Sequence, residues 1–167
     1  MKVIILAGGK GSRFSGLTNS IPKPLINVNG KPIITRIIEH YSRFGFKNFI
    51  VPVGYKGEMI KSYFKNFDLN NSNLKVTFSP NKIVEYDKKF EGLSFQIIDT
   101  GLETLTALRL YKIKQFLNDE IFMLTYGDGL SDVNISHLLD FHKSHGKIGT
   151  MTIIRPPGRF GELELNK

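Results

Sequence analysis

The chain has 167 residues, about one domain's worth, and its contents of 41% apolar and 23% charged residues are ordinary for a globular protein. It contains no cysteine, which excludes disulfides and cysteine-ligated zinc, and no apolar run approaches the roughly 18 residues of a membrane span. The net charge of +8 favours anionic ligands, but no block of five Lys or Arg occurs. We therefore expect a cytoplasmic protein that binds small anions, with no nucleic-acid or membrane partner.

The first third of the chain alternates strand and helix patterns. The continuous apolar run at residues 2–7 predicts a strand that is buried on both faces of a parallel sheet. A helix is predicted to start at Pro32 and to stop at Gly45, because apolar residues recur between them at helical spacing. Residues 48–53 form the next predicted strand, and residues 57–67 the second predicted helix.

The rest of the chain continues this alternation. Strands are predicted at 74–79 and 93–98, with a polar, charged excursion at 80–92 between them. The later predicted elements are a helix at 104–117, a strand at 121–125, a helix at 134–145, an extended segment at 148–154, a Pro/Gly turn region at 155–161 and another strand at 162–166.

Strands that alternate with helices predict an α/β protein with three layers, α/β/α, around a mostly parallel central sheet. Right-handed crossovers would then place the loop at Gly8–Gly11 and Asp128 at the same edge, where ligands bind. The chain stops in a freshly started strand. We therefore expect residues 1–167 to be one domain that is incomplete at its C-terminus.

The segment 6–25, LAGGKGSRFSGLTNSIPKPL, carries the strongest functional signal. It joins a glycine-rich loop to Lys10, Arg13 and Lys23, and no Asp or Glu occurs from Met1 to Ile38. Bare backbone N–H groups beside unpaired cations suit a polyphosphate. The alternative is a merely tight turn, which would not explain the cations.

Two common phosphate-binding motifs do not match this segment. A dinucleotide fingerprint needs a third glycine after Gly9 and Gly11, and none follows at the required spacing. A Walker A loop would need lysine where Leu17 stands. What remains is the pattern G-G-x-G-[ST]-R, followed at a distance by Pro-Lys-Pro.

Asp128 follows an apolar strand in the sequence Gly-Asp-Gly. A carboxylate at this position suits Mg²⁺, which prefers oxygen ligands and bridges substrate phosphates, although an Asp-Gly turn is the simpler alternative. His137, His142 and His145 are interpreted as a solvated helix face rather than a metal site.

These motifs resemble the signature of the sugar-phosphate nucleotidyltransferases. The matches are LAGGKGSRF and PKPL near the N-terminus, VGYKG at 53–57, DTG at 99–101, TYGDG at 125–129 and PPGRFG at 156–161. Among the members of that family the chain is most similar to those that use CTP and glucose 1-phosphate. The resemblance implies a Rossmann-like nucleotidyltransferase fold.

The resemblance also implies roles for individual residues. Arg13 and Lys23 would be catalytic, stabilising the leaving pyrophosphate and the charge at the reaction centre, and Asp128 would hold Mg²⁺. The nucleotide-binding set it implies is Leu6, Ala7, Gly8, Gly9, Lys10, Gly11, Ser12, Arg13, Lys23, Thr104, Arg109 and Gly127. The family's second metal-binding aspartate and a sugar-phosphate lysine would lie beyond Lys167.

The implied reaction is transfer of the CMP unit of CTP to glucose 1-phosphate, giving CDP-glucose and pyrophosphate for surface-polysaccharide sugars. Ala107 and Leu108 stand where the family has two glycines, which leaves the base and the sugar open. The alternatives are a catalytically silent or truncated nucleotide-binding domain, and an enzyme for another nucleoside triphosphate or phosphorylated acceptor. A homo-oligomer is compatible with each.

Overall fold

The computed structural model of the chain describes residues 1–10, 20–78, 82–87, 89–118 and 120–154. It divides into two compact units, Met1–Asp132 and Val133–Lys167, which are described separately below. Within the described ranges, every helix is too short or too polar to cross a membrane.

A four-stranded parallel sheet forms the centre of the first unit, with the strand order β7-β4-β1-β8. Lys2 at the start of β1 lies opposite Asn48 on one side and Phe122 on the other, so β1 is an inner strand. The strands are β1 Lys2–Leu6, β4 Asn48–Val53, β7 Ser94–Asp99 and β8 Phe122–Tyr126.

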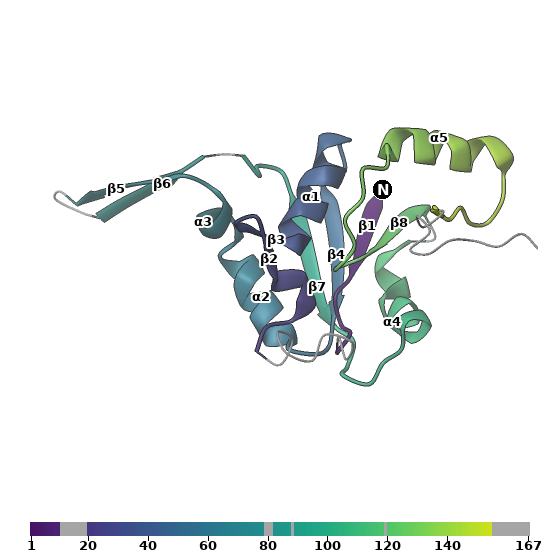
Figure 1. Cartoon of the computed structure of the whole chain (residues 1–167), viewed down its shortest axis with the longest axis horizontal. Helices are drawn as coiled ribbons and strands as arrows, with labels where there is room; N and C mark the ends of the chain where they lie inside the picture. Colours follow the sequence, from purple (N-terminus) through teal and green to yellow (C-terminus); the bar gives the residue numbers. More distant parts are fainter. Residues whose placement is uncertain (11–19, 79–81, 88, 119, 155–167) are drawn as a thin grey trace, which may run out of the picture. The chain divides into compact units, whose positions relative to one another are not determined.

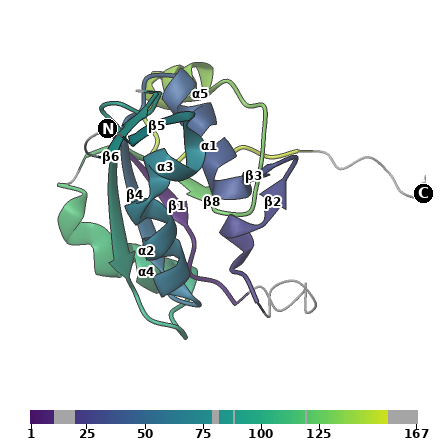
Figure 2. The same cartoon turned by 90° about the vertical axis from the view of Figure 1, so that its left-hand side faces the viewer.

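Helices connect these strands and cover both faces of the sheet. The connections through α1 (Ile33–Arg43) and α2 (Gly57–Lys65) step from β1 to β4 to β7, whereas α4 (Thr106–Ile113) returns the chain to β8. Because such crossovers are right-handed, α1 and α2 share one face and α4 lies on the other. Figure 1 shows this division, and Figure 2 shows α1 and α2 in front of β1 and β4. The predicted three-layer α/β fold is confirmed.

The core beneath α4 is made by alternate residues of the inner strands. Ile4 and Leu6 of β1 pack with Ile50 of β4 against Ile113 and Leu117, and all five are buried. A full set of such apolar contacts contributes on the order of 1.5–3 kcal/mol per buried side chain.

Phenylalanines fill the core on the opposite face. Phe49 of β4 stacks on Phe95 of β7, with ring centroids 5.5 Å apart. The ring of Phe95 also lies 4.8 Å from Phe64 and 4.9 Å from Phe67, and so joins the sheet to the helices that cover it.

Several short elements complete the first unit. They are the 3₁₀ turns η1 Lys23–Leu25 and η2 Lys114–Phe116, the small antiparallel pair β2 Asn27–Val28 and β3 Lys31–Pro32, the helix α3 Phe67–Asn71, and the hairpin β5 Leu74–Phe78 with β6 Lys82–Tyr86. Figure 1 shows the β5–β6 hairpin extending away from the four-stranded sheet.

The second unit contains the helix α5, Ile135–His145. Asn134 precedes it, and its side-chain oxygen accepts a hydrogen bond of 3.0 Å from the backbone N–H of His137, which fixes the start of the helix. Gly146 follows in the left-handed region at φ +63°.

Most predicted boundaries hold within a residue or two, including the strand at 48–53 and the helix stop at Gly45, which has φ +84°. The single helix predicted at 57–67 is wrong, because the structure breaks it into α2 and α3 at Asn66. Asn66 has φ −113° and ψ 27°, and its N–H bonds to the carbonyl of Tyr63 rather than continuing the helical pattern.

The polar excursion predicted at 80–92 is also wrong in part, because Lys82–Tyr86 forms β6. Its charged residues hid the strand pattern: Lys75 and Glu85 lie opposite each other and form an ion pair of 3.2 Å on one face of the hairpin. A cross-strand charge pair of this kind stabilises the ribbon.

The last elements differ from expectation as follows. The helix predicted at 104–117 begins later, at Thr106, because Leu105 is extended at φ −74° and ψ 163°. Residues 148–154, which the structure describes, form no strand there. The turn at 155–161 and the strand at 162–166 lie outside the described residues.

Candidate functional site

The strand order places a switch point between the carboxyl ends of β1 and β8, and we call this edge of the sheet, with Gly8, Lys23, Gly127 and Asp128, the crevice. The chain leaves β1 toward β4 on one side and returns later to β8 on the other, so the direction of winding reverses at β1. In open α/β sheets, ligands bind at this switch point. Gly8 follows β1 and Asp128 follows β8, and the sequence predicted both at this edge.

Backbone hydrogen bonds hold the ends of the strands in place. The N–H of Gly127 donates to the carbonyl of Leu6 at 2.8 Å, and the N–H of Tyr55 donates to the carbonyl of Gly8 at 3.2 Å. A Cβ at Gly127 would lie 2.9 Å from the oxygen of Leu6 and 3.0 Å from Pro24. Glycine is therefore required at position 127 for the turn after β8 to pack against β1 and η1.

This packing brings Lys23 and Asp128 together from positions 105 residues apart. Lys23 Nζ lies 3.5 Å from Asp128 Oδ2, and the lysine side chain is only 17% exposed while the aspartate is 44% exposed. Pro22 and Pro24 flank the lysine and fix the backbone that carries it. The two predicted residues thus form one charged pair in the crevice.

Arg109 is buried under the loops that follow β1, β4 and β7. The residue is 4% exposed, and its side chain donates to the carbonyls of Gly8 at 2.9 Å and Gly101 at 2.8 Å, and to the Thr100 hydroxyl at 2.6 Å. Further hydrogen bonds reach the carbonyls of Val53 at 3.1 Å and Leu102 at 3.3 Å. The guanidinium therefore ties together the loop after β1, the end of β4 and the loop after β7.

Burial lowers the pKa of Arg109, and the nearby charge of Asp99 partly offsets that effect. Arginine remains protonated in proteins, so a positive charge surrounded by carbonyls lies beneath the crevice.

The glycines of these loops make room for Arg109. A Cβ at Gly8 would lie 2.3 Å from its Nη1, and a Cβ at Gly54 would lie 2.5 Å from the carbonyl oxygen of Gly101. A Cβ at Gly9, by contrast, would meet nothing within 4 Å. Gly8 and Gly54 are therefore explained by packing, and the open side of Gly9 leaves its backbone accessible.

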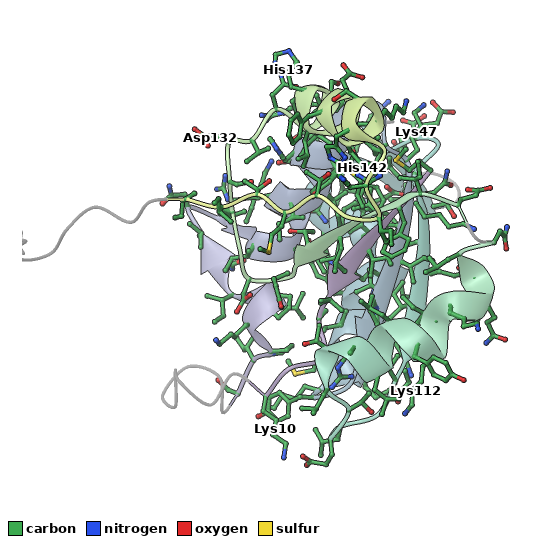
Figure 3. The ribbon with its side chains drawn as sticks, turned by 90° about the vertical axis from the view of Figure 1, so that its right-hand side faces the viewer. Lys10, Lys47, Lys112, Asp132, His137 and His142 are labelled. Carbon is green, nitrogen blue, oxygen red and sulfur yellow. The ribbon has the colours of Figure 1, made fainter. Side chains whose placement is uncertain are left out.

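A second charged pair joins two loops at the same edge. The ammonium of Lys10, after β1, contacts the carboxylate of Glu103, which lies between β7 and α4. Both side chains are exposed, by 49% and 76%. Lys112 of α4 lies at the same end of the unit (Figure 3), and its Nζ donates to the carbonyl of Thr100 at 2.7 Å.

Of the predicted site residues, the structure gathers Leu6, Gly8, Lys23, Gly127 and Asp128 in or beside the crevice. Ala7 and Gly9 belong to the same stretch after β1, where the N–H of Ala7 donates to the carbonyl of Pro52 at 3.1 Å.

Thr104 lies in the loop between β7 and α4. Its hydroxyl bonds within that loop, since it donates to the carbonyl of Thr100 at 2.6 Å. Gly11, Ser12 and Arg13 lie outside the described residues. Direct contact of Arg109 and Thr104 with a nucleotide stays a prediction.

Sequence reasoning missed three residues of this region: Gly54, Thr100 and Glu103. Gly54 and Thr100 lie in the VGYKG and DTG motifs, so the sequence marks both segments. The motifs do not show that these residues contact Arg109. Glu103 lies 93 residues from Lys10, and no local pattern joins them.

The histidines of α5 are not simply solvated, as the sequence suggested. His142 Nδ1 and His145 Nε2 lie 2.9 and 2.8 Å from the single hydroxyl oxygen of Thr150, within the second unit. Among the described residues, no group of three His, Asp or Glu side chains is placed to hold a metal ion. Figure 3 labels His137 and His142 on this helix.

A well-defined cavity in the described part of the first unit lies elsewhere. It has a volume of about 560 Å³ and is lined mainly by apolar side chains between the end of α2 and the β5–β6 hairpin, including Phe64, Phe67, Leu74 and Val84. It lacks the paired charges of the crevice, which is shaped by loops at the sheet edge.

The fold places the chain in a recognisable class of α/β proteins. It superposes on UDP-glucose pyrophosphorylase in complex with UDP-glucose, with a TM-score of 0.64 and 16% identity, over 86% of this chain and 53% of that one. It also superposes on a putative glucose-1-phosphate thymidylyltransferase from Bacillus anthracis, with a TM-score of 0.65 and 17% identity, over 87% and 52% of the two chains. Identities this low show the fold alone.

The sequence then fixes the family. The family model for nucleotidyl transferases matches residues 2–165, and the chain belongs to this family. It is 43% identical to a glucose-1-phosphate cytidylyltransferase of Salmonella typhimurium, over 99% of this chain and 65% of that protein. It is 41% identical to a probable glucose-1-phosphate cytidylyltransferase of Bacillus subtilis, over 98% and 64%. The chain thus spans somewhat less than two thirds of the curated relatives that it matches.

Proposed function

We propose that this chain binds CTP and transfers its CMP unit to glucose 1-phosphate, with release of pyrophosphate. The observation that carries the proposal is the Lys23–Asp128 pair in the crevice between β1 and β8, in a chain 43% identical to a glucose-1-phosphate cytidylyltransferase. In this reaction an oxygen of the sugar phosphate attacks the α-phosphorus of CTP. The bond from that phosphorus to the bridging oxygen breaks, and pyrophosphate leaves with the electron pair.

Both reactants are anions, so their mutual repulsion is a large part of the barrier. Lys23 is suited to offset it, because its largely buried ammonium is held between two prolines and needs little reorganisation. The backbone of Gly9, which nothing crowds, would receive the phosphates, with Lys10 beside it. Arg13 would contact the β- and γ-phosphates, as the family resemblance implies.

The donor set in the crevice fits Mg²⁺. Asp128 offers one half-exposed carboxylate, and Mg²⁺ is commonly held by one or two carboxylates together with phosphate oxygens and water. When bound, the ion would neutralise phosphate charge. Asp128 would then exchange its contact with Lys23 for the ion, and Lys23 would contact the phosphates.

Two measurements test the proposal. Titration calorimetry of the chain with CTP should give binding in the presence of Mg²⁺ and much weaker binding in EDTA. A pyrophosphate-release assay with glucose 1-phosphate should then be run with CTP, UTP, GTP and dTTP. Binding of CTP with Mg²⁺ and preferential release from CTP would support the proposal. Absence of CTP binding, or preferential release of pyrophosphate from another triphosphate, would overturn it.

A second candidate is a nucleotide-binding domain without catalytic activity. It is favoured by the extent of the match, which covers 65% of the Salmonella relative. The same two measurements separate the candidates, because this domain would bind CTP with Mg²⁺ and yet release no pyrophosphate when glucose 1-phosphate is added.

A further inference from the structure

The Lys10–Glu103 ion pair spans the opening between two loops of the candidate nucleotide site. Lys10 lies in the loop after β1, and Glu103 lies in the loop between β7 and α4. Their side chains are 49% and 76% exposed, so the contact is made at the surface and is open to anything that enters the site.

The same two loops are tied together underneath by Arg109. Its guanidinium binds the carbonyl of Gly8 on one side and the carbonyls of Gly101 and Leu102 on the other. These hydrogen bonds are buried or partly buried, whereas the Lys10–Glu103 contact is exposed. The buried hydrogen bonds of Arg109 therefore fix the separation of the two loops. The exposed Lys10–Glu103 ion pair can break without moving the backbone of either loop.

The relative strengths of two interactions favour release of Lys10 from Glu103. An exposed ion pair is worth about 0–1 kcal/mol, because water screens it and two flexible side chains must be held. Hydrogen bonds from an ammonium to phosphate oxygens are charge-assisted and stronger, and a triphosphate carries several negative charges. A polyphosphate that reaches Lys10 would therefore displace Glu103.

We propose that the Lys10–Glu103 pair is a latch that closes the nucleotide site of the free protein, and that phosphates of the incoming nucleoside triphosphate open it by taking Lys10 from Glu103. Glu103 thereby competes with the substrate and sets the affinity of the site. This inference rests on the proposed function, since it requires that a triphosphate binds beside Lys10.

Zero-length crosslinking with a carbodiimide tests the latch directly. The reagent joins a lysine amine to a carboxylate in contact with it as an amide, and carries the carboxylate oxygen away as a urea. In the free protein we expect peptide mass spectrometry to find the Lys10–Glu103 and Lys75–Glu85 crosslinks. CTP with Mg²⁺ should suppress the first at least severalfold and leave the second unchanged. The second pair, on the β5–β6 hairpin, reports any loss of reagent to the nucleotide.

The Lys23–Asp128 crosslink separates failure of the latch from failure of the proposed function. If CTP suppresses neither Lys23–Asp128 nor Lys10–Glu103, CTP does not bind and the proposed function is wrong. If CTP suppresses Lys23–Asp128 alone, the nucleotide binds and the latch is wrong. Inorganic pyrophosphate should also suppress the Lys10–Glu103 crosslink, and cytidine should not; the reverse result would contradict a contest between phosphates and Glu103.

Variants give a quantitative check. Glu103→Gln should tighten CTP binding by about two- to fivefold, the factor expected for removal of an exposed competing ion pair. Lys10→Met should weaken binding, and the double variant should bind as weakly as Lys10→Met alone. The control is Glu85→Gln, which removes the same charge from the exposed Lys75–Glu85 pair. Equal affinities for Glu103→Gln and Glu85→Gln would overturn the latch.

Discussion

At the scale of single residues, Arg109 is the side chain on which the candidate site most depends for its shape. It contacts no carboxylate among the hydrogen bonds of the described residues and instead donates to carbonyls of two loops and of the end of β4. Arginine suits this position because its planar group presents five donors in fixed directions, which the ammonium of lysine does not.

We therefore expect Arg109→Lys to lower the free energy of unfolding by about 2–4 kcal/mol, because it leaves buried carbonyls without donors. Urea unfolding followed by circular dichroism would measure this. Arg43→Lys is the matched control, since Arg43 is exposed at the end of α1. A stability of Arg109→Lys equal to that of the control would show that the loops do not need this guanidinium.

Substitution of Asp128, in contrast to Arg109, should affect ligand binding more than the stability of the fold. Its side chain is 44% exposed and its pairing with Lys23 is long, at 3.5 Å, so Asp128→Asn should change the free energy of unfolding by no more than about 1 kcal/mol. The same variant should weaken Mg²⁺-dependent binding of CTP by roughly tenfold or more, the range for residues that support a metal site. Calorimetry with Mg²⁺ and with EDTA, beside a melting curve, separates the two effects. A loss of thermal stability without loss of Mg²⁺ dependence would make Asp128 a structural turn residue.

At the scale of elements, Glu39 on α1 joins three separate segments. It lies 2.7 Å from Lys31 of β3 and 2.6 Å from Lys89, which precedes β7 in the chain, and its side chain is 13% exposed. Burial alone would raise the pKa of Glu39, but the hydrogen bonds and charges of Lys31 and Lys89 outweigh it and hold the pKa below its ordinary value of 4.5.

The sign of the pH dependence follows from that direction. Because the pKa in the folded state is lower than in the unfolded state, the carboxylate stabilises the fold above pH 4.5, and its contribution is lost as the pH falls through the folded-state pKa. Glu39→Gln should cost about 1–2 kcal/mol at neutral pH. Urea unfolding from pH 7 to pH 3 should show the gap between variant and wild type closing below pH 4.5. A gap independent of pH would mean that the side chain acts by packing.

The elements that the sequence predicted well are those with a strong local pattern. The apolar spacing of α1 and the β-branched run of β4 are visible in short windows, and both elements were found with nearly correct ends. The break between α2 and α3 was missed because the apolar stripe continues through Asn66 into Phe67. Strand β6 was missed because its sequence, KIVEY, sets two apolar residues side by side between charged ones and does not alternate apolar with polar residues.

The candidate site was predictable only in part, for a similar reason. The glycine loop and Asp128 stand at strand ends, and topology alone brings them to one edge. Apart from the Thr100 hydroxyl, the partners of Arg109 are backbone carbonyls, which every residue carries, so the residue types in the sequence do not reveal them. The Lys10–Glu103 pair depends on how two loops approach across the sheet, which only the three-dimensional structure gives.

At the scale of the whole molecule, the net charge of +8 should assist the binding of anions from solution. Salt shortens the reach of this field, from about 10 Å at 0.1 M to about 3 Å at 1 M. We expect the affinity for CTP to fall roughly tenfold between about 0.05 and 0.5 M NaCl. Cytidine, which carries no phosphate, should show little change over the same range. Equal salt dependence for both ligands would mean that the phosphates are not what the protein attracts.

The guanidinium beneath the loops has a consequence for the kinetics of ligand capture. Since the carbonyls of Gly8 and Gly101 are already tied down, this part of the site acquires its form during folding and need not be ordered when a nucleotide arrives. A preorganised receptor spares its ligand that entropic penalty. Capture by these loops should then proceed in one kinetic phase whose rate rises in proportion to ligand concentration, without a plateau set by slow rearrangement.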